Sequence, residues 1–288
     1  MPPHSPLISP DELDTLLHSP AEKIVLIDAS YAIGATGLDP ETVFNQMRIG
    51  QAQFFDIDRI ADQTNPLPHM LPSPDDFAQA VGALGISNDH TVICYDQSGI
   101  VMAACRAWWM FRVFGHDKVY VLNGGLPGWQ AAGLPLTTAP VSQPKPQTFV
   151  PKFRPELVID YQSMRQAVEA SSSIILDARP KERFMGLTPE PRPNLSAGHM
   201  PGAISVPAGS LIDPRSRELL PQPVTQQLFY DLNLKPDSPI ITTCGSGVTA
   251  CVIALALFQN GYENATVYDG SWTEWGQEIL NSPIIKAN

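Results

Sequence analysis

The residue with the clearest chemical potential is Cys244, which stands where an apolar stretch meets a glycine-containing loop. The residues before it, Ile240–Thr243, are of types that favour a short buried strand. The loop continues as Gly-Ser-Gly-Val-Thr249 and leads into a run of helix-forming residues. A strand, a tight loop and a helix start direct several backbone N–H groups and the positive end of a helix dipole to one point. The pattern predicts an anion cradle that contains a sulfur nucleophile, and the alternative is an inert buried cysteine at the end of a strand.

A cysteine in such a cradle is expected to hold its thiolate form more readily than a free thiol does. The other cysteines have different surroundings. Cys94 lies within an apolar strand pattern, and Cys105 and Cys251 lie in helical patterns with apolar neighbours, so all three are interpreted as core residues. The four cysteines form no Cys-x-x-Cys pair and show no metal-binding spacing with histidines. We therefore expect no metal, no disulfide scaffold and a reducing, cytoplasmic location.

Composition excludes several other classes of protein. The 288 residues are enough for two domains of ordinary size, and the formal net charge is −11. Such a charge argues against a nucleic-acid or anionic-membrane partner, because phosphate surfaces require clustered cations. No apolar run approaches the roughly 18 residues of a membrane helix, and the N-terminus lacks the pattern of a secretory signal. An anionic substrate would need a local basic pocket.

The chain reads as a duplicated unit. Asp28 and Asp96 each follow a short strand pattern and are 68 residues apart, and Asp177 and Cys244 repeat this with a separation of 67. A glycine-rich turn and a tryptophan follow in both halves, so an offset of about 148 residues maps one half onto the other. The halves differ at the position of the nucleophile, where the first half has Asp96 and the second has Cys244. An aspartate cannot carry sulfur, so the first half is predicted to be non-catalytic.

Short apolar strands alternate with helical patterns within each half, which is typical of an α/β domain with a mainly parallel sheet flanked by helices. Ser9-Pro10 and Ser73-Pro74 are typical helix starts. A proline-dense stretch separates the halves and is predicted to be a semi-rigid linker over the surface. The predicted domains are 1–135, a linker at 136–156, and 157–288.

These features together resemble the tandem rhodanese-domain sulfurtransferases, in the 3-mercaptopyruvate branch. The resemblance covers nearly the whole chain, and its most specific motif is Cys244-Gly-Ser-Gly-Val-Thr249. Further matching motifs are Gly198-His-Met-Pro-Gly-Ala203, Tyr268-Asp-Gly-Ser-Trp272, Trp275, Phe54-Phe-Asp-Ile-Asp58, His69-Met-Leu-Pro72 and Trp108-Trp-Met-Phe-Arg112. One departure is Gly50-Gln-Ala-Gln53, where many relatives have a Gly-His-Ile-Pro type of turn.

The resemblance implies a catalytic C-terminal domain, a non-catalytic N-terminal domain and a cysteine persulfide intermediate. The thiolate of Cys244 takes sulfur from a donor and passes it to a nucleophilic acceptor. Backbone N–H groups of the loop then stabilise the charged persulfide as they would an oxyanion. The residues expected to supply them or to line the loop are Gly245, Ser246, Gly247, Val248 and Thr249. No cofactor is required.

The family also indicates which sulfur donor fits. Rhodaneses specialised for thiosulfate carry a basic pair after the cysteine, whereas this chain has the neutral Gly245 and Ser246. A monoanionic 2-oxo acid, 3-mercaptopyruvate, is therefore expected, with its carboxylate held by Arg183 and Arg192, because a guanidinium fork suits a carboxylate. The alternative is that both arginines belong to a surface loop. Arg179 is interpreted as structural.

A serine, a histidine and an aspartate lie beside the cysteine in these relatives, and the matching positions are Ser246, His69 and Asp58. His69 and Asp58 come from the first half of the sequence, so the site is expected where the domains meet. Ser246, oriented by His69, would polarise the substrate carbonyl or manage the proton of the departing enolate. The alternative for His69 is a hydrogen-bonded structural residue. His199 is assigned to a structural turn, and Asp177 is expected to accept from backbone donors near the cradle.

Three rival functions are weighed against this one. A phosphatase or arsenate reductase needs an arginine six positions after the cysteine, where this chain has Ala250. A binding or scaffold role is disfavoured by the cysteine in its loop. Thiosulfate:cyanide sulfurtransferase activity stays open as the alternative within the family. Thioredoxin, glutathione, cyanide and a dedicated partner protein are all compatible acceptors.

Overall fold

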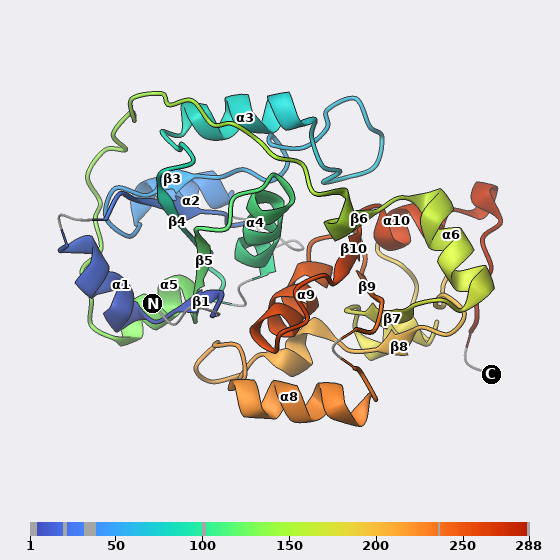
Figure 1. Ribbon diagram of the computed structural model, residues 1–288. Helices are drawn as coiled ribbons and strands as arrows, with labels where there is room; N and C mark the ends of the chain where they lie inside the picture. The colour runs from blue at the N-terminus through green and yellow to red at the C-terminus, as the bar shows by residue number, and fades with distance from the viewer. Residues whose placement is uncertain (1–4, 20–21, 32–38, 100–101, 236, 287–288) are drawn as a thin grey trace. The chain divides into compact units, whose positions relative to one another are not determined.

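The computed structural model describes residues 5–19, 22–31, 39–99, 102–235 and 237–286. Its contacts divide the chain into two units, whose elements are labelled in Figure 1. The first unit comprises Met1–Asp62, Leu71–Arg154 and Asp213–Leu219, and the second comprises Gln63–Met70, Pro155–Ile212 and Leu220–Asn288. Each unit is described by itself below.

The described part of the first unit contains five strands, which are β1 (Leu7–Ile8), β2 (Ile24–Asp28), β3 (Gln53–Phe54), β4 (Thr91–Tyr95) and β5 (Val119–Leu122). Its described helices are α1 (Pro10–Leu17), α2 (Pro40–Gln46), α3 (Pro74–Ala83), α4 (Met102–Val113) and α5 (Gly125–Ala131).

Among its described residues, the second unit also has five strands, which are β6 (Val158–Ile159), β7 (Ile174–Asp177), β8 (Ile204–Ser205), β9 (Ile240–Thr243) and β10 (Thr266–Tyr268). Its described α-helices are α6 (Tyr161–Ala170), α7 (Lys181–Phe184), α8 (Gln222–Asp231), α9 (Ala250–Gln259) and α10 (Ser271–Trp275). Three short 3₁₀ helices complete it: η1 (Pro155–Leu157), η2 (Ala208–Leu211) and η3 (Glu278–Leu280).

The two sheets share one topology. The strand order is β1-β5-β4-β2-β3 in the first sheet and β6-β10-β9-β7-β8 in the second, and every strand pair is parallel. The central pairs even keep the same register, because Asp28 pairs with Tyr95 and Asp177 with Thr243. The predicted duplication of a parallel α/β unit is thereby confirmed, and Asp96 and Cys244 both follow directly after the equivalent strands β4 and β9.

The helices begin where local chemistry predicts them. Ser9 and Glu12 form a reciprocal capping box ahead of α1, with Pro10 in the first turn. Ser73 caps α3 by accepting a hydrogen bond from the backbone of Asp76. These caps satisfy N–H groups that would otherwise lack partners, and so they set the helix starts independently of the tertiary packing.

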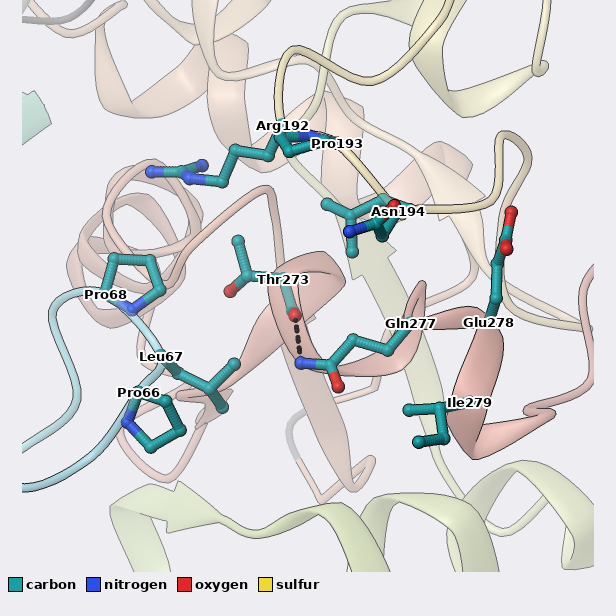
Figure 2. Close-up of a pocket in the computed structure, with 11 residues that line it drawn as sticks. Pro66, Leu67, Pro68, Arg192, Pro193, Asn194, Thr273, Gln277, Glu278 and Ile279 are labelled. Carbon is teal, nitrogen blue, oxygen red and sulfur yellow. Dashed lines mark hydrogen bonds between the residues drawn. The ribbon is translucent and has the colours of Figure 1, made fainter.

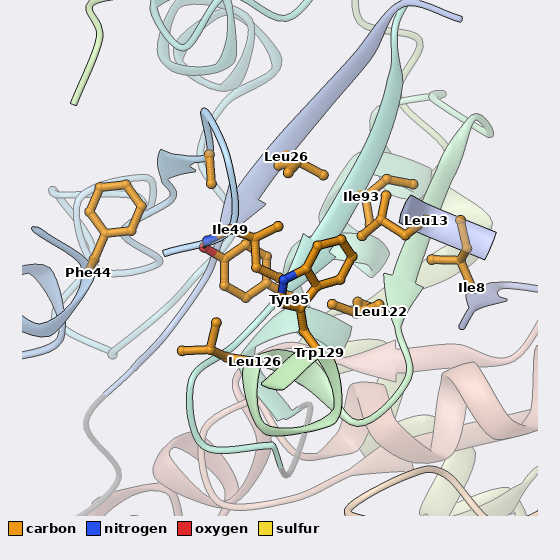
Figure 3. Packing of buried hydrophobic residues seen from close by; sticks show 11 residues of the cluster. Ile8, Leu13, Leu26, Phe44, Ile49, Ile93, Tyr95, Leu122, Leu126 and Trp129 are labelled. Atoms are coloured by element: carbon orange, nitrogen blue, oxygen red, sulfur yellow. Dashed lines mark hydrogen bonds between the residues drawn. The ribbon is translucent and has the colours of Figure 1, made fainter. Parts of the chain in front are cut away.

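Helices cover both faces of each sheet. On one face of the first sheet, Trp129 of α5 and Leu13 of α1 pack with Ile93 and Tyr95 of β4 (Figure 3). The other face carries α3 and α4, joined by edge-to-face packing of Phe77 on Phe111. In the second unit, α6 and α10 share a cluster with residues of β7, β9 and β10, while α9 packs on β9, β10 and α8.

The predicted linker belongs to the first unit as far as Arg154. The backbone N–H of Gln147 donates to the carbonyl of Gly82, that of Lys152 donates to Phe114, and the Phe149 side chain is buried. The segment therefore differs from an independent spacer between domains. Its prolines exclude it from helices and sheets, but its remaining N–H groups and one phenylalanine still find partners on the unit surface.

Two further observations bear on function. Cys94, Cys105 and Cys251 are buried and form no disulfide, as expected for core residues. Among the helices that the structure describes, none combines the length and the apolar character that crossing a membrane requires.

Candidate active site

The loop from Cys244 to Thr249 joins β9 to α9, as the sequence predicts. Gly247 has a φ of 74°, in the left-handed region where a side chain is disfavoured, and this lets the chain turn sharply. Residues Ala250–Leu257 of α9 are all buried. Because the helix is apolar on every side, it is held within the unit, and its N-terminus is fixed against the loop.

Cys244 is anchored by a serine from a distant turn. Its side chain is almost fully buried, and its backbone N–H donates to the Oγ of Ser271 over 3.1 Å. The same hydroxyl donates to the carbonyl of Tyr268 and lies 3.9 Å from the Cys244 Sγ. The cysteine carbonyl accepts from the Trp272 N–H. The turn before α10 thus holds the nucleophile residue on both sides of its peptide.

The loop presents unused backbone donors. Within the described part of the chain, no acceptor bonds the N–H groups of Gly245, Ser246, Val248 or Thr249. The carbonyl of Gly245 is held by the N–H of Thr273 at 2.8 Å, which fixes the orientation of that peptide. Together with the positive end of α9, these groups are available to an anion, as the predicted cradle requires.

A buried chain of charges leads to this loop. Asp177 accepts three hydrogen bonds from the Arg179 guanidinium, and Arg179 Nη1 donates to Glu190 Oε1 over 2.8 Å. The other carboxylate oxygen of Glu190 accepts from Arg183 Nη2. That same Nη2 lies 3.3 Å from the point where a Cβ on Gly245 would stand. Arg183 is therefore placed over the loop, as a carboxylate clamp requires.

Arg192 lines a cavity of about 610 Å³ that adjoins the loop through Thr273 (Figure 2). The guanidinium has no ion pair or hydrogen bond within the part of the chain that the structure describes. The cavity is also lined by Pro66, Leu67 and Pro68 of the segment 63–70, and by Asn194, Gln277, Glu278 and Ile279. Arg192 thus has its donors available beside a space large enough for a small organic anion.

The sequence also matches a known family of protein domains. A model described as the rhodanese-like domain matches the chain twice, over residues 9–132 and 160–278. The chain belongs to the rhodanese-like domain family. Each match covers four of the five strands of one parallel sheet, so the tandem rhodanese-like organisation expected from the repeat is confirmed.

Curated relatives cover nearly the full length of this rhodanese-like chain. It is 42% identical to the 3-mercaptopyruvate sulfurtransferase of Escherichia coli K12, over 90% of this chain and 91% of the relative. It is 36% identical to the human 3-mercaptopyruvate sulfurtransferase, over 97% of this chain and 94% of the relative.

The solved structures agree. The crystal structure of SseA from Escherichia coli, described as showing the rhodanese fold of 3-mercaptopyruvate sulfotransferases, has a TM-score of 0.82 and 38% identity. It covers 94% of this chain and 100% of that one. Tum1 from Saccharomyces cerevisiae has a TM-score of 0.88 at 33% identity, and 99% of each chain is covered.

The first rhodanese-like unit has no sulfur at the equivalent position. The buried Asp96 carboxylate accepts from Ser98 Oγ and from the Gly99 N–H, so it occupies its own loop. Burial raises the pKa of Asp96, and burial likewise raises the pKa of Asp28 to about 6 against its hydrogen bonds from Ser30 and Gln97. The loop position that holds a cysteine in one repeat therefore holds an internal carboxyl group in the other.

The remaining predicted residues are placed as follows. His69 is buried with a φ of 62°, and the segment 63–70 that carries it belongs by its contacts to the second unit. Its place early in the sequence had predicted that His69 belongs to the first domain. Asp58 belongs to the first unit, where its N–H donates to Asp56. The Ser246 hydroxyl is partly exposed and bonds no described residue.

The residues interpreted as structural have corresponding contacts. Arg179 is buried with its guanidinium carbon 3.9 Å from the centre of the Trp272 ring, and it also donates to the Gly198 carbonyl. Asp177 accepts from the Arg179 backbone. His199 stacks on Phe184 and bonds its carbonyl.

Sequence reasoning missed three contributors to the site. Ser271 and Thr273 hold the loop peptides, and Glu190 holds Arg183. Ser271 lies in a recognised motif, but its role arises from a contact 27 residues away in the chain. The signal for Glu190 was its position between two prolines beside Arg192, which is weak because such loops are common. Among the described residues, no group of three or more His, Cys, Asp or Glu side chains is placed to hold a metal ion.

Proposed function

We propose that this chain is a sulfurtransferase that takes sulfur from 3-mercaptopyruvate and carries it as a persulfide on Cys244. The observation that carries the proposal is the Cys244 loop, in which unused backbone N–H groups surround the residue and Arg183 stands over Gly245. The names of the relatives from Escherichia coli and human support the choice of donor.

In the proposed reaction, sulfur moves in two displacement steps at Cys244. The Cys244 thiolate attacks the donor sulfur and forms an S–S bond, while the C–S bond of the donor breaks and its electron pair leaves as the enolate of pyruvate. The enolate then takes a proton to give pyruvate. In the second half-reaction an acceptor thiolate attacks the outer sulfur and releases the Cys244 thiolate.

The cradle and the arginines divide the work of binding. The N–H groups of the loop stabilise the charge on the thiolate and on the persulfide. Arg183 and Arg192 bind the carboxylate of the donor and hold its sulfur near Cys244, because guanidinium and carboxylate form paired, directional hydrogen bonds. The neutral Gly245 and Ser246 suit a monoanion better than the dianion thiosulfate.

We assign proton management to Ser246 and His69. Ser246 follows the nucleophile by two residues, and its hydroxyl is available to polarise the donor carbonyl. His69 belongs to the same unit and is nearly fully buried. The part of Asp58 in this group stays a prediction from the family resemblance.

The acceptor is proposed to be a thiol, such as that of thioredoxin, and the location is proposed to be the cytoplasm. The four cysteines all lie in the described part of the chain and form no disulfide, which supports a reducing compartment. The proposal includes no nucleic-acid or membrane partner, because the chain carries 29 acidic against 18 basic residues.

Mass spectrometry tests the intermediate directly. Incubation with 3-mercaptopyruvate without an acceptor should add about 32 Da, the mass of one sulfur atom, to the peptide that contains Cys244. Cys244→Ser should abolish both this adduct and turnover. Absence of the adduct in the wild-type protein would refute the persulfide.

Steady-state kinetics then test the roles of the side chains. Arg183→Ala and Arg192→Ala should each raise KM for 3-mercaptopyruvate by roughly 10- to 100-fold, since a charge-assisted hydrogen bond contributes about 1.5–3 kcal/mol. Arg165→Ala is the matched control, because Arg165 is exposed on α6 and interacts with Glu169 and Tyr161 of the same helix. Unchanged turnover in His69→Ala would remove the role given to His69. A higher kcat/KM with thiosulfate than with 3-mercaptopyruvate would favour the thiosulfate:cyanide alternative.

A further inference from the structure

We propose that Glu190 sets the donor specificity of this enzyme, by holding Arg183 over the loop and cancelling one positive charge of the carboxylate clamp. The inference rests on the proposed function and concerns which anion the clamp accepts. Its basis is the shared carboxylate of Glu190, whose side chain is only 1% exposed.

Glu190 is a positioning residue because it joins the buried Arg179 to the partly exposed Arg183. One oxygen accepts from Arg179, which is itself locked by Asp177, by the Gly198 carbonyl and by the ring of Trp272. The other oxygen accepts from Arg183, whose side chain is 23% exposed. The buried end of this chain therefore determines where the partly exposed guanidinium of Arg183 lies.

The group has no net charge. Asp177 and Glu190 supply two carboxylates, and Arg179 and Arg183 supply two guanidinium groups. Arg183 thus provides hydrogen-bond donors to a substrate while its charge is already matched by Glu190. Within the described residues, Arg192 is the member of the clamp that has no acidic partner.

This charge balance suits one negative charge better than two. A 2-oxo acid with a single carboxylate neutralises Arg192, whereas thiosulfate, with two charges, leaves an excess negative charge in a site partly removed from water. Glu278 also lines the cavity, but its side chain is exposed and therefore screened by water. The buried carboxylate of Glu190 is the group best placed to discriminate by charge.

The decisive variant is Glu190→Gln, which keeps the shape and one acceptor oxygen but removes the charge. A unit charge at a distance on the order of 10 Å in such a site changes the affinity for a monoanion about tenfold, and that for a dianion by the square of this factor. We therefore expect the ratio of kcat/KM for thiosulfate to kcat/KM for 3-mercaptopyruvate to rise about tenfold, mainly through KM.

Two further variants separate charge from position. Glu190→Asp keeps the charge but shortens the reach, so it should raise KM for 3-mercaptopyruvate while the ratio between the donors stays within about twofold of wild type. Glu182→Gln is the matched control, because Glu182 is exposed on α7 beside Arg183, and its ratio should equal that of wild type.

The wild-type protein supplies a test that does not depend on folding of the variants. The monoanion 2-oxobutanoate should compete with 3-mercaptopyruvate at least about tenfold better than the dianion oxaloacetate, which has a similar size. Equal competition by the two anions, or an unchanged donor ratio in a folded Glu190→Gln protein, would overturn the inference. Failure of the wild-type protein to form the Cys244 persulfide would instead refute the proposed function.

Discussion

Replacing Ser271 by alanine should loosen the catalytic loop, because it removes the hydroxyl that links the Cys244 N–H to the Tyr268 carbonyl. The Ser271 hydroxyl accepts from the Cys244 N–H at 3.1 Å and lies 3.9 Å from the Sγ, and Ser271 is fully buried. Alanine keeps the backbone and the Cβ but leaves the Cys244 N–H without its acceptor.

The size of the effect on amide exchange follows from the Cys244 N–H that loses its acceptor. A buried donor that loses its partner costs about 1–3 kcal/mol, which corresponds to a roughly 5- to 150-fold faster exchange of the Cys244 amide through local opening. The effect on catalysis should be smaller than removal of a direct oxyanion donor, because the 3.9 Å contact with sulfur is long. We expect kcat/KM for 3-mercaptopyruvate to fall by roughly tenfold.

Amide hydrogen exchange of the peptide 240–249 and steady-state kinetics measure the two effects. Ser205→Ala is the matched control, because the Ser205 hydroxyl is also buried in the second unit but has no hydrogen-bond partner among the described residues. Its removal should change neither quantity. If Ser271→Ala exchanges and turns over like wild type and like Ser205→Ala, the hydroxyl does not anchor the nucleophile.

Two further predictions concern stability. Gly198→Ala should destabilise the second unit by at least about 3 kcal/mol in denaturant unfolding, because φ is 124° and the new Cβ would lie 2.4 Å from the Ile285 carbonyl oxygen. Gly202→Ala, at a φ of 76° with open space around it, should cost only about 1 kcal/mol, and equal costs would contradict the argument. Asp28 has a pKa raised from 3.8 to about 6, so the unfolded chain ionises first and the first unit loses about 3 kcal/mol of unfolding free energy as pH rises through this window. Asp28→Asn should therefore gain stability relative to wild type between pH 4 and pH 7 in urea unfolding, and a constant difference would refute the assignment.

Local patterns were sufficient for much of the fold. The strand Ile240–Thr243 was predicted with its exact bounds, and the capped start of α1 followed from Ser9, Pro10 and Glu12. Such features depend on neighbours in sequence, namely side-chain type and the partners of the first helical N–H groups. The repeat also followed from sequence, because equal spacing of strand ends implies equal topology.

The surroundings of the site were less accessible to sequence reasoning. The segment 63–70 belongs with the second unit although it lies in the first half of the chain, and residues 136–154 belong with the first unit although they look like a linker. Neither segment has a periodic pattern. Their placement depends on which surface offers partners for their backbone groups and for their few apolar side chains. That surface exists only in the folded units.

The sequence by itself determined that a cysteine follows a short strand in one repeat and that an aspartate follows the corresponding strand in the other. Residue identity at the equivalent position decides which loop can carry sulfur, because a cysteine side chain can form a persulfide and an aspartate side chain cannot. Only the tertiary structure decided that Ser271 holds the Cys244 peptide and that Glu190 shares its carboxylate between Arg179 and Arg183. These contacts join segments without a common pattern, because a hydrogen bond depends on where atoms meet in space and not on their spacing along the chain.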